Sequence, residues 1–304
     1  MLRTTLRTVL VGLCLMVITA ALPRGAEAQA KVTLEEQSEY GPALAYNNDM
    51  VYMAWTGRGD NKINIMRSDE GIDWRTKITL EEQSNHPPSL AAFNGILYLA
   101  WTGRDEKINI MRSDNGIDWR TKITLEEQSD LEPGLVALEG KLYLVWKGRG
   151  NDKINMMQSS NGIDWGGKVT LEEQTENRPS LTALNGRLFI SWTGRGDEKI
   201  NVMRSTDGID WSGKVILEEQ SNVGPGLATF QGRLFLVWTG RDEKLNIMRS
   251  DEGIDWRAKI TLEEQTNDSP TVAAMGEHLF LAWTGRGGND KLNIARSPNG
   301  IDFQ

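Results

Sequence analysis

Residues 88–128 read PSLAAFNGILYLAWTGRDEKINIMRSDNGIDWRTKITLEEQ, and this stretch decides the fold. Residues 89–93 and 96–101 are mostly apolar or aromatic, and they flank an Asn-Gly pair that supplies the positive φ angles of a two-residue hairpin. Residues 107–111 and 122–125 are similar apolar runs, and no run shows the 3.6-residue period of a helix. The stretch therefore predicts four consecutive β-strands.

The same unit occurs six times along the chain. One tryptophan per unit recurs at intervals of 45 or 46 residues, at Trp55, Trp101, Trp146, Trp192, Trp238 and Trp283. One proline keeps the same interval, at Pro42, Pro88, Pro133, Pro179, Pro225 and Pro270. Four strands in each repeat of about 45 residues are typical of a propeller blade.

The two ends of the repeat array indicate a closed ring. The repeats fall at 31–76, 77–121, 122–167, 168–213, 214–258 and 259–304. Residues 31–37 have the sequence of a fourth strand, and residues 301–304 end just before a fourth strand would begin. An open stack would need polar capping repeats, whereas closure removes exposed sheet edges. We therefore expect an all-β, six-bladed propeller of four-stranded blades as a single domain, with the N-terminal strand completing the last blade.

Residues 1–30 have the features of a secretory signal peptide. Arg3 and Arg7 precede 14 apolar or small residues at 9–22, and the small-residue sequence AEAQA follows at 26–30. A membrane anchor would need about 20 apolar residues. We therefore expect an exported chain, secreted or periplasmic, without membrane insertion after cleavage. The only cysteine, Cys14, lies in this segment, so no disulfide is expected in residues 31–304.

The charge of the chain argues against several classes of partner. The formal net charge is −8, and the first thirty residues carry three arginines against one glutamate, so residues 31–304 carry −10. An acidic chain without a basic run is poorly suited to nucleic acid or anionic lipid. Two histidines and no cysteine after residue 30 leave little material for a zinc site. No cofactor is predicted.

A short motif, Ser-x-x-Gly-x-Asp-Trp, separates the third and fourth strands of the repeats. It resembles the Asp box of sialidase-type propellers, Ser-x-Asp-x-Gly-x-x-Trp, with one residue fewer between serine and glycine. Six copies between the same two strands favour a structural turn, in which glycine permits an unusual backbone and Ser or Asp bonds nearby amides. Its structural residues are Gly71, Asp73, Trp74, Gly116, Asp118, Trp119, Gly162, Asp164, Trp165, Gly208, Asp210, Trp211, Gly253, Asp255 and Trp256, and the last copy ends in Phe303.

The resemblance raises glycoside hydrolysis as an alternative function. Sialidases of this type use three arginines, a tyrosine nucleophile with a glutamate partner, and an aspartate acid/base, but the five tyrosines here all lie in the first half of the chain. The Phe/Tyr-Arg-Ile-Pro stretch of that family is absent. Non-repeated residues such as Lys147, Gln158, Arg178 and His278 form no evident acid/base pair. Near-identical blades give their acids equal environments, whereas glycosidases need two distinct ones. No catalytic residue is therefore assigned.

In a four-stranded meander, the loop between strands two and three and the connection from strand four to the next blade emerge on the same face. Two repeated elements of this sequence should therefore meet on one face of the ring. One is a Gly-Arg loop that carries Arg58, Arg104, Arg149, Arg195, Arg241 and Arg286. The other is a Glu-Glu-Gln connection, in which strand alternation points the second glutamate between blades. Those glutamates are Glu36, Glu82, Glu127, Glu173, Glu219 and Glu264.

These arginines and glutamates admit two interpretations. Guanidinium, carboxylate and amide groups near a tryptophan suit a sugar, so six equivalent glycan sites would make a multivalent lectin-like module. Alternatively, the same residues pair across blades and stabilise the ring, and Trp101, which lies among apolar strand residues, packs between sheets. Acids of the Gly-Arg loops are suitable calcium ligands, but adjacent Arg and Lys compete for them, so no metal is assigned. A protein-binding scaffold is a further alternative.

Overall fold

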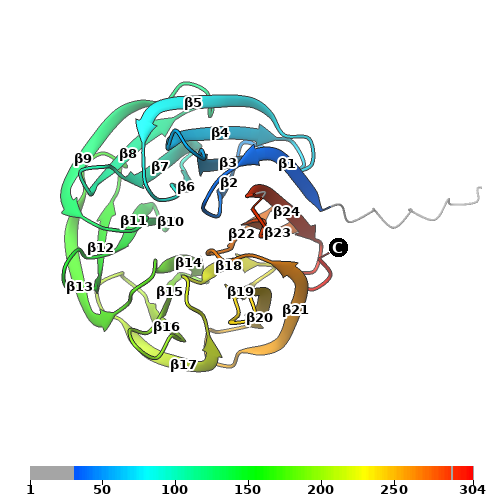
Figure 1. The fold of residues 1–304 in the computed structure, drawn as a ribbon. Coiled ribbons are helices and arrows are strands. Elements are labelled where there is room, and N and C mark those ends of the chain that lie inside the picture. Colours follow the sequence, from blue (N-terminus) through cyan, green and yellow to red (C-terminus); the bar gives the residue numbers. More distant parts are fainter. Residues whose placement is uncertain (1–30, 289, 304) are drawn as a thin grey trace, which may run out of the picture.

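The computed structural model describes residues 31–288 and 290–303, so the predicted signal peptide lies outside the described residues. Twenty-four strands form six four-stranded antiparallel sheets. The sheets are arranged as blades around a central axis (Figure 1). The predicted six-bladed propeller is confirmed.

Blade 1 contains β2 (Ala43–Asn47), β3 (Met50–Thr56), β4 (Lys62–Ser68) and β5 (Arg75–Gln83). Blade 2 contains β6 (Ser89–Phe93), β7 (Ile96–Thr102), β8 (Lys107–Ser113) and β9 (Arg120–Gln128). Blade 3 contains β10 (Gly134–Leu138), β11 (Lys141–Lys147), β12 (Lys153–Ser159) and β13 (Gly166–Gln174). Blade 4 contains β14 (Ser180–Leu184), β15 (Arg187–Thr193), β16 (Lys199–Ser205) and β17 (Ser212–Gln220). Blade 5 contains β18 (Gly226–Phe230), β19 (Arg233–Thr239), β20 (Lys244–Ser250) and β21 (Arg257–Gln265). Blade 6 contains β22 (Thr271–Met275), β23 (His278–Thr284), β24 (Lys291–Ser297) and β1 (Val32–Gln37). The innermost strands are β2, β6, β10, β14, β18 and β22 (Figure 1).

The ring closes as the ends of the repeat array predict. Strand β1, from the start of the described chain, is the outer strand of blade 6 and pairs antiparallel with β24 (Figure 1). Val32 lies opposite Ile294, and Gln37 lies opposite Lys291. Blade 6 therefore combines strands from the two ends of the described chain.

The outer strands extend further than the sequence pattern suggests. Strand β9 runs to Gln128, so the Glu-Glu-Gln segment belongs to the strand and not to a connection. Between the pairs Lys107–Gln128 and Asn109–Thr124 the register shifts, which is a bulge that the alternation of apolar residues does not reveal. The Thr124 hydroxyl donates to Asn109 Oδ1 at 2.7 Å beside this bulge.

The core lies between adjacent blades. In one cluster, Tyr52 and Ala54 of blade 1 pack with Leu97, Leu99 and Trp101 of blade 2. The six repeat tryptophans are at most 1% exposed, so each contributes the large apolar area of an indole to a blade junction. Within residues 31–288 and 290–303, no helix is long and apolar enough to cross a membrane.

Candidate functional site

The Gly-Arg loops of blades 1, 3 and 4 lie against the outer strand of the preceding blade. In blade 3 the Arg149 amide donates to the Gln128 carbonyl of β9 at 3.4 Å, and Arg58 and Arg195 make the equivalent bond to Gln37 and Gln174. The loop arginines and the second glutamates are therefore brought to the same blade junctions, on one face of the ring.

The guanidinium groups of these loops pair with acids and not with the Glu-Glu-Gln glutamates. The acid comes from the preceding blade, where it is the residue directly before the lysine that begins the third strand. The pairs are Arg58–Asp290, Arg149–Glu106, Arg195–Asp152, Arg241–Glu198 and Arg286–Glu243. Arg58 and Asp290 are 2.6 Å apart, and Arg241 and Glu198 are 2.9 Å apart. Among the described residues, Arg104 has no such ion pair, because Asn61 occupies the equivalent position.

The second glutamates form a separate ring of inter-blade ion pairs. Glu82 of β5 accepts from Lys122 Nζ of β9 at 2.5 Å, and the ammonium lies 5.4 Å from the centre of the Trp101 ring. The full set is Lys31–Glu264, Lys77–Glu36, Lys122–Glu82, Lys168–Glu127, Lys214–Glu173 and Lys259–Glu219. Each outer strand therefore presents a glutamate to one neighbouring blade and a lysine to the other.

The lysines of this ring were missed by the sequence interpretation, although strand alternation contains the signal. Lys122 and Glu127 are separated by an odd number of positions on β9, so their side chains leave opposite faces of the strand. The tryptophan is packed between sheets, as its position among apolar strand residues predicts. Trp101 is 1% exposed and faces the Lys122 ammonium, so it does not offer a surface on which a sugar ring would stack.

We expect Lys122→Met to lower the free energy of unfolding by about 1 kcal/mol, since it removes a partly exposed ion pair and a cation–π contact together. Lys107→Met is the matched control, because Lys107 pairs with Glu126 of its own blade and its loss leaves the junction intact. Urea unfolding of the two variants measures the difference. Equal stability of the two would show that the inter-blade ring adds nothing.

The turns between the third and fourth strands are held by side chains of the motif. Ser113 Oγ accepts from the Gly116 amide at 2.8 Å. Asn115 Oδ1 accepts from the Ile117 and Asp118 amides at 2.8 and 2.9 Å. The Asp118 carboxylate instead accepts from Asn115 Nδ2 at 2.9 Å. The serine, as predicted, and the residue before the glycine therefore bond the amides of this turn, whereas the aspartate does not.

Each motif glycine also lies against an aromatic ring of a neighbouring blade. An added Cβ at Gly116 would overlap Cε1 of Tyr52, whose hydroxyl donates to the Asn115 carbonyl at 3.4 Å. The other glycine–aromatic pairs are Gly71–Phe280, Gly162–Tyr98, Gly208–Tyr143, Gly253–Phe189 and Gly300–Phe235. The motif therefore joins blades as well as strands.

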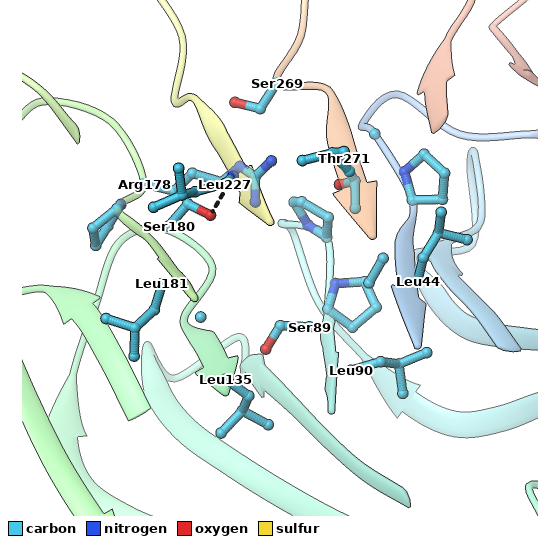
Figure 2. Close-up of a pocket in the computed structure, with 18 residues that line it drawn as sticks. Leu44, Ser89, Leu90, Leu135, Arg178, Ser180, Leu181, Leu227, Ser269 and Thr271 are labelled. Carbon is cyan, nitrogen blue, oxygen red and sulfur yellow. Dashed lines mark hydrogen bonds between the residues drawn. The ribbon is translucent and has the colours of Figure 1, made fainter. Parts of the chain in front are cut away.

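A second candidate site lies on the axis, where the innermost strands converge (Figure 2). The pocket there has a volume of about 110 Å³. Its wall includes leucine, proline and hydroxyl side chains, and Arg178 is the charged side chain that lines it. Labelled in Figure 2 are Leu44, Leu90, Leu135, Leu181, Leu227, Ser89, Ser180, Ser269 and Thr271.

Arg178 connects several blades at the mouth of this axial pocket. Its Nε lies 3.0 Å from Glu132 Oε1 in the loop before blade 3, and its Nη2 donates to the Pro270 carbonyl before blade 6 at 2.9 Å. It passes over Gly224, where an added Cβ would overlap Arg178 Cγ. Arg178 and Glu132 thus form a charge pair that sequence position did not reveal.

Burial raises the pKa of Glu132 to about 7, and the Arg178 charge opposes that rise. Burial also raises the pKa of Asp268, which accepts from the Gly41 amide at 2.5 Å. Neither Glu132 nor Asp268 is part of the pocket wall. Among residues 31–288 and 290–303, no group of three or more His, Cys, Asp or Glu side chains is placed to hold a metal ion.

Comparison with known proteins identifies the fold alone. No protein-family model and no curated protein matches the sequence, but many solved structures match the propeller. The fold is that of sialidases and lectins. A Hadza microbial sialidase, Hz136, aligns with a TM-score of 0.65 at 13% identity, over 86% of this chain and 66% of that one.

Two lectins resemble the propeller over nearly their full length. The Aleuria aurantia lectin, in complex with α-methyl-L-fucoside, has a TM-score of 0.64 at 13% identity, over 88% of this chain and 96% of the lectin. The SapL1 lectin, in complex with α-methyl fucoside, has a TM-score of 0.65 at 14% identity with the same coverage.

Proposed function

We propose that this protein is an exported, multivalent carbohydrate-binding module, with equivalent sites at the blade junctions on the face of the Gly-Arg loops. The observation that carries the proposal is the repetition of one polar arrangement at every junction. Each junction holds a loop arginine, the Lys–Glu pair and the polar end of an outer strand. Paired charges held in place offer fixed donors and acceptors, which is what the hydroxyl groups of a sugar require.

Multivalency makes such shallow sites useful. A single sugar site of about millimolar affinity corresponds to about −4 kcal/mol. Several sites engaged on one glycan-bearing surface multiply the apparent affinity by roughly 10² to 10⁴ without new contacts. The similar fold of two lectins in complex with fucosides is consistent with the proposal.

Glycoside hydrolysis has less support. The axial pocket has a single charged side chain among its lining residues, and the two carboxyls whose pKa burial raises, those of Glu132 and Asp268, are not part of its wall. A glycosidase needs two carboxyl groups beside the scissile bond. The non-repeated residues Arg178 and Lys147 are also engaged, since Lys147 pairs with Asp130 and Asp152 at 2.8 Å.

A glycan array tests the proposal, with residues 31–304 applied in calcium and in chelator. We expect binding to a related group of sugars, lost when the six loop arginines become alanine in a ring that still folds. The matched control replaces Arg75, Arg120 and Arg257, which are ion-paired and exposed at the turn motifs of the other face. A blank array from folded protein would refute the proposal and favour a protein-binding scaffold.

A further inference from the structure

One blade junction differs in charge from the other five. At those five, the loop arginine is paired with an acid of the preceding blade, as described above. At the junction of blades 1 and 2 the equivalent of that acid is Asn61, and the exposed Arg104 has no ion pair among the described residues. The difference is not due to loop length, because Arg241 lies in an equally short loop and pairs with Glu198.

The next position that faces the loop arginine is also neutral at this junction. At the junction of blades 3 and 4, Arg195 lies 3.7 Å from Glu176, at the start of the connection to the next blade. The residue equivalent to Glu176 beside Arg104 is Asn85, which accepts from Asn61 Nδ2 at 3.1 Å. Two amides bonded to each other therefore replace two acids, and neither neutralises the guanidinium of Arg104.

The other charged groups of this junction are already engaged. Glu82 pairs with Lys122, Glu81 with Lys62, and Glu106 with Arg149 of the next blade. Asp60 and Asp105 accept from the amides of Lys62 and Lys107, which closes their own loops. The ion pairs of Glu82, Glu81 and Glu106 recur around the ring, and Asp60 stays an acceptor within its own loop, where Asn151 takes the same role in blade 3. The absence of an acid at position 61 is therefore what sets Arg104 apart from the other loop arginines.

We propose that the junction of blades 1 and 2 binds an acidic saccharide, with Arg104 engaging a sulfate or carboxylate group, while the other five junctions take neutral sugars. This inference rests on the proposed function, since it assigns a ligand class to one of the six sites. A guanidinium offers paired donors to either anion. At the other junctions the acid beside the arginine occupies that position and repels a second negative charge.

The test uses three probes that differ only at one carbon: galactose, galacturonic acid and galactose 6-sulfate, each immobilised on beads. We expect the native protein to prefer the two acidic probes, and Asn61→Asp to weaken them about tenfold while leaving galactose unchanged, as for loss of a charge-assisted hydrogen bond. The preference should weaken as salt rises, because exposed charges are screened. The sulfate and carboxylate arms decide which anion is taken.

A second variant moves the site to another junction. Glu198→Asn removes the acid beside Arg241 and leaves two amides there, the new one and the existing Asn222, which reproduces the pair beside Arg104. We therefore expect it to double the number of acidic-probe sites.

Equal binding of acidic and neutral probes by the native protein, or no change in either variant, would overturn the inference. If neutral sugars bind and the acidic preference is absent, only this inference fails. If loss of all six arginines leaves neutral binding intact, the proposed function fails instead.

Discussion

Gly116→Ala is expected to lower the free energy of unfolding by about 2–5 kcal/mol. Gly116 has a φ of +72°, where a side chain costs roughly 1–2 kcal/mol, and its added methyl would overlap the Tyr52 ring. Tyr52 is 3% exposed and packed in the core between blades 1 and 2, so it cannot move aside without strain of about 1–3 kcal/mol. Urea unfolding measures the loss.

Gly140→Ala separates the two causes. Gly140 also has a positive φ, +75°, but an added Cβ there would meet no atom within 4 Å. We expect this variant to lose only the free energy of unfolding that a side chain at a positive φ costs, roughly 1–2 kcal/mol. If both variants lose the same amount, the contact between the motif glycine and the neighbouring aromatic ring carries no stability, and the motif acts within its own blade alone.

Arg178→Ala is expected to destabilise the ring by about 3–5 kcal/mol at roughly pH 8, because the buried Glu132 must then either stay ionised without its partner or hold a proton that the unfolded chain releases at this pH. At about pH 5 the carboxyl is protonated in the folded state, so the loss should fall to about 1–2 kcal/mol, typical of a lost hydrogen bond. Thermal or urea unfolding at the two pH values gives the comparison.

The direction of the pH effect follows from the raised pKa of Glu132. Between its ordinary value of 4.5 and about 7 the folded protein holds a proton that the unfolded chain releases, so stability falls as pH rises through this range. The raised pKa of Asp268 acts in the same direction. Glu132→Gln should remove the part of the pH dependence of the free energy of unfolding that Glu132 contributes. A variant that keeps the full slope would place the titration elsewhere.

Much of the fold was predictable because the repeat carries its information locally. The Asn94-Gly95 hairpin, the apolar runs around Trp101 and the fourth-strand sequence at the start of the described chain each predict an element that the structure contains. The length of β9 was not predictable from alternation, since the bulge opposite Lys107 changes the register without changing the composition.

The candidate sites were predictable only in part. Strand alternation indicates that Glu82 points toward the next blade, but not that Lys122 meets it over Trp101. The pair of Arg178 and Glu132 joins residues one repeat apart, whose positions within the repeat are occupied elsewhere by Gly, Pro or Ser. Such a contact depends on how the ring converges at its axis, which no local pattern encodes.

The closing strand has a mechanical consequence. Val32 pairs with Ile294, so the beginning of β1 lies beside the middle of β24. Because the two strands are antiparallel, the start of β1 and the end of β24 lie toward the same end of this strand pair. A force applied through the two ends would load the hydrogen bonds of the pair one after another, because these bonds run perpendicular to the strands. The β1–β24 pair would therefore separate at low force, one hydrogen bond at a time. Pulling on both ends would unfold blade 6 before the other blades.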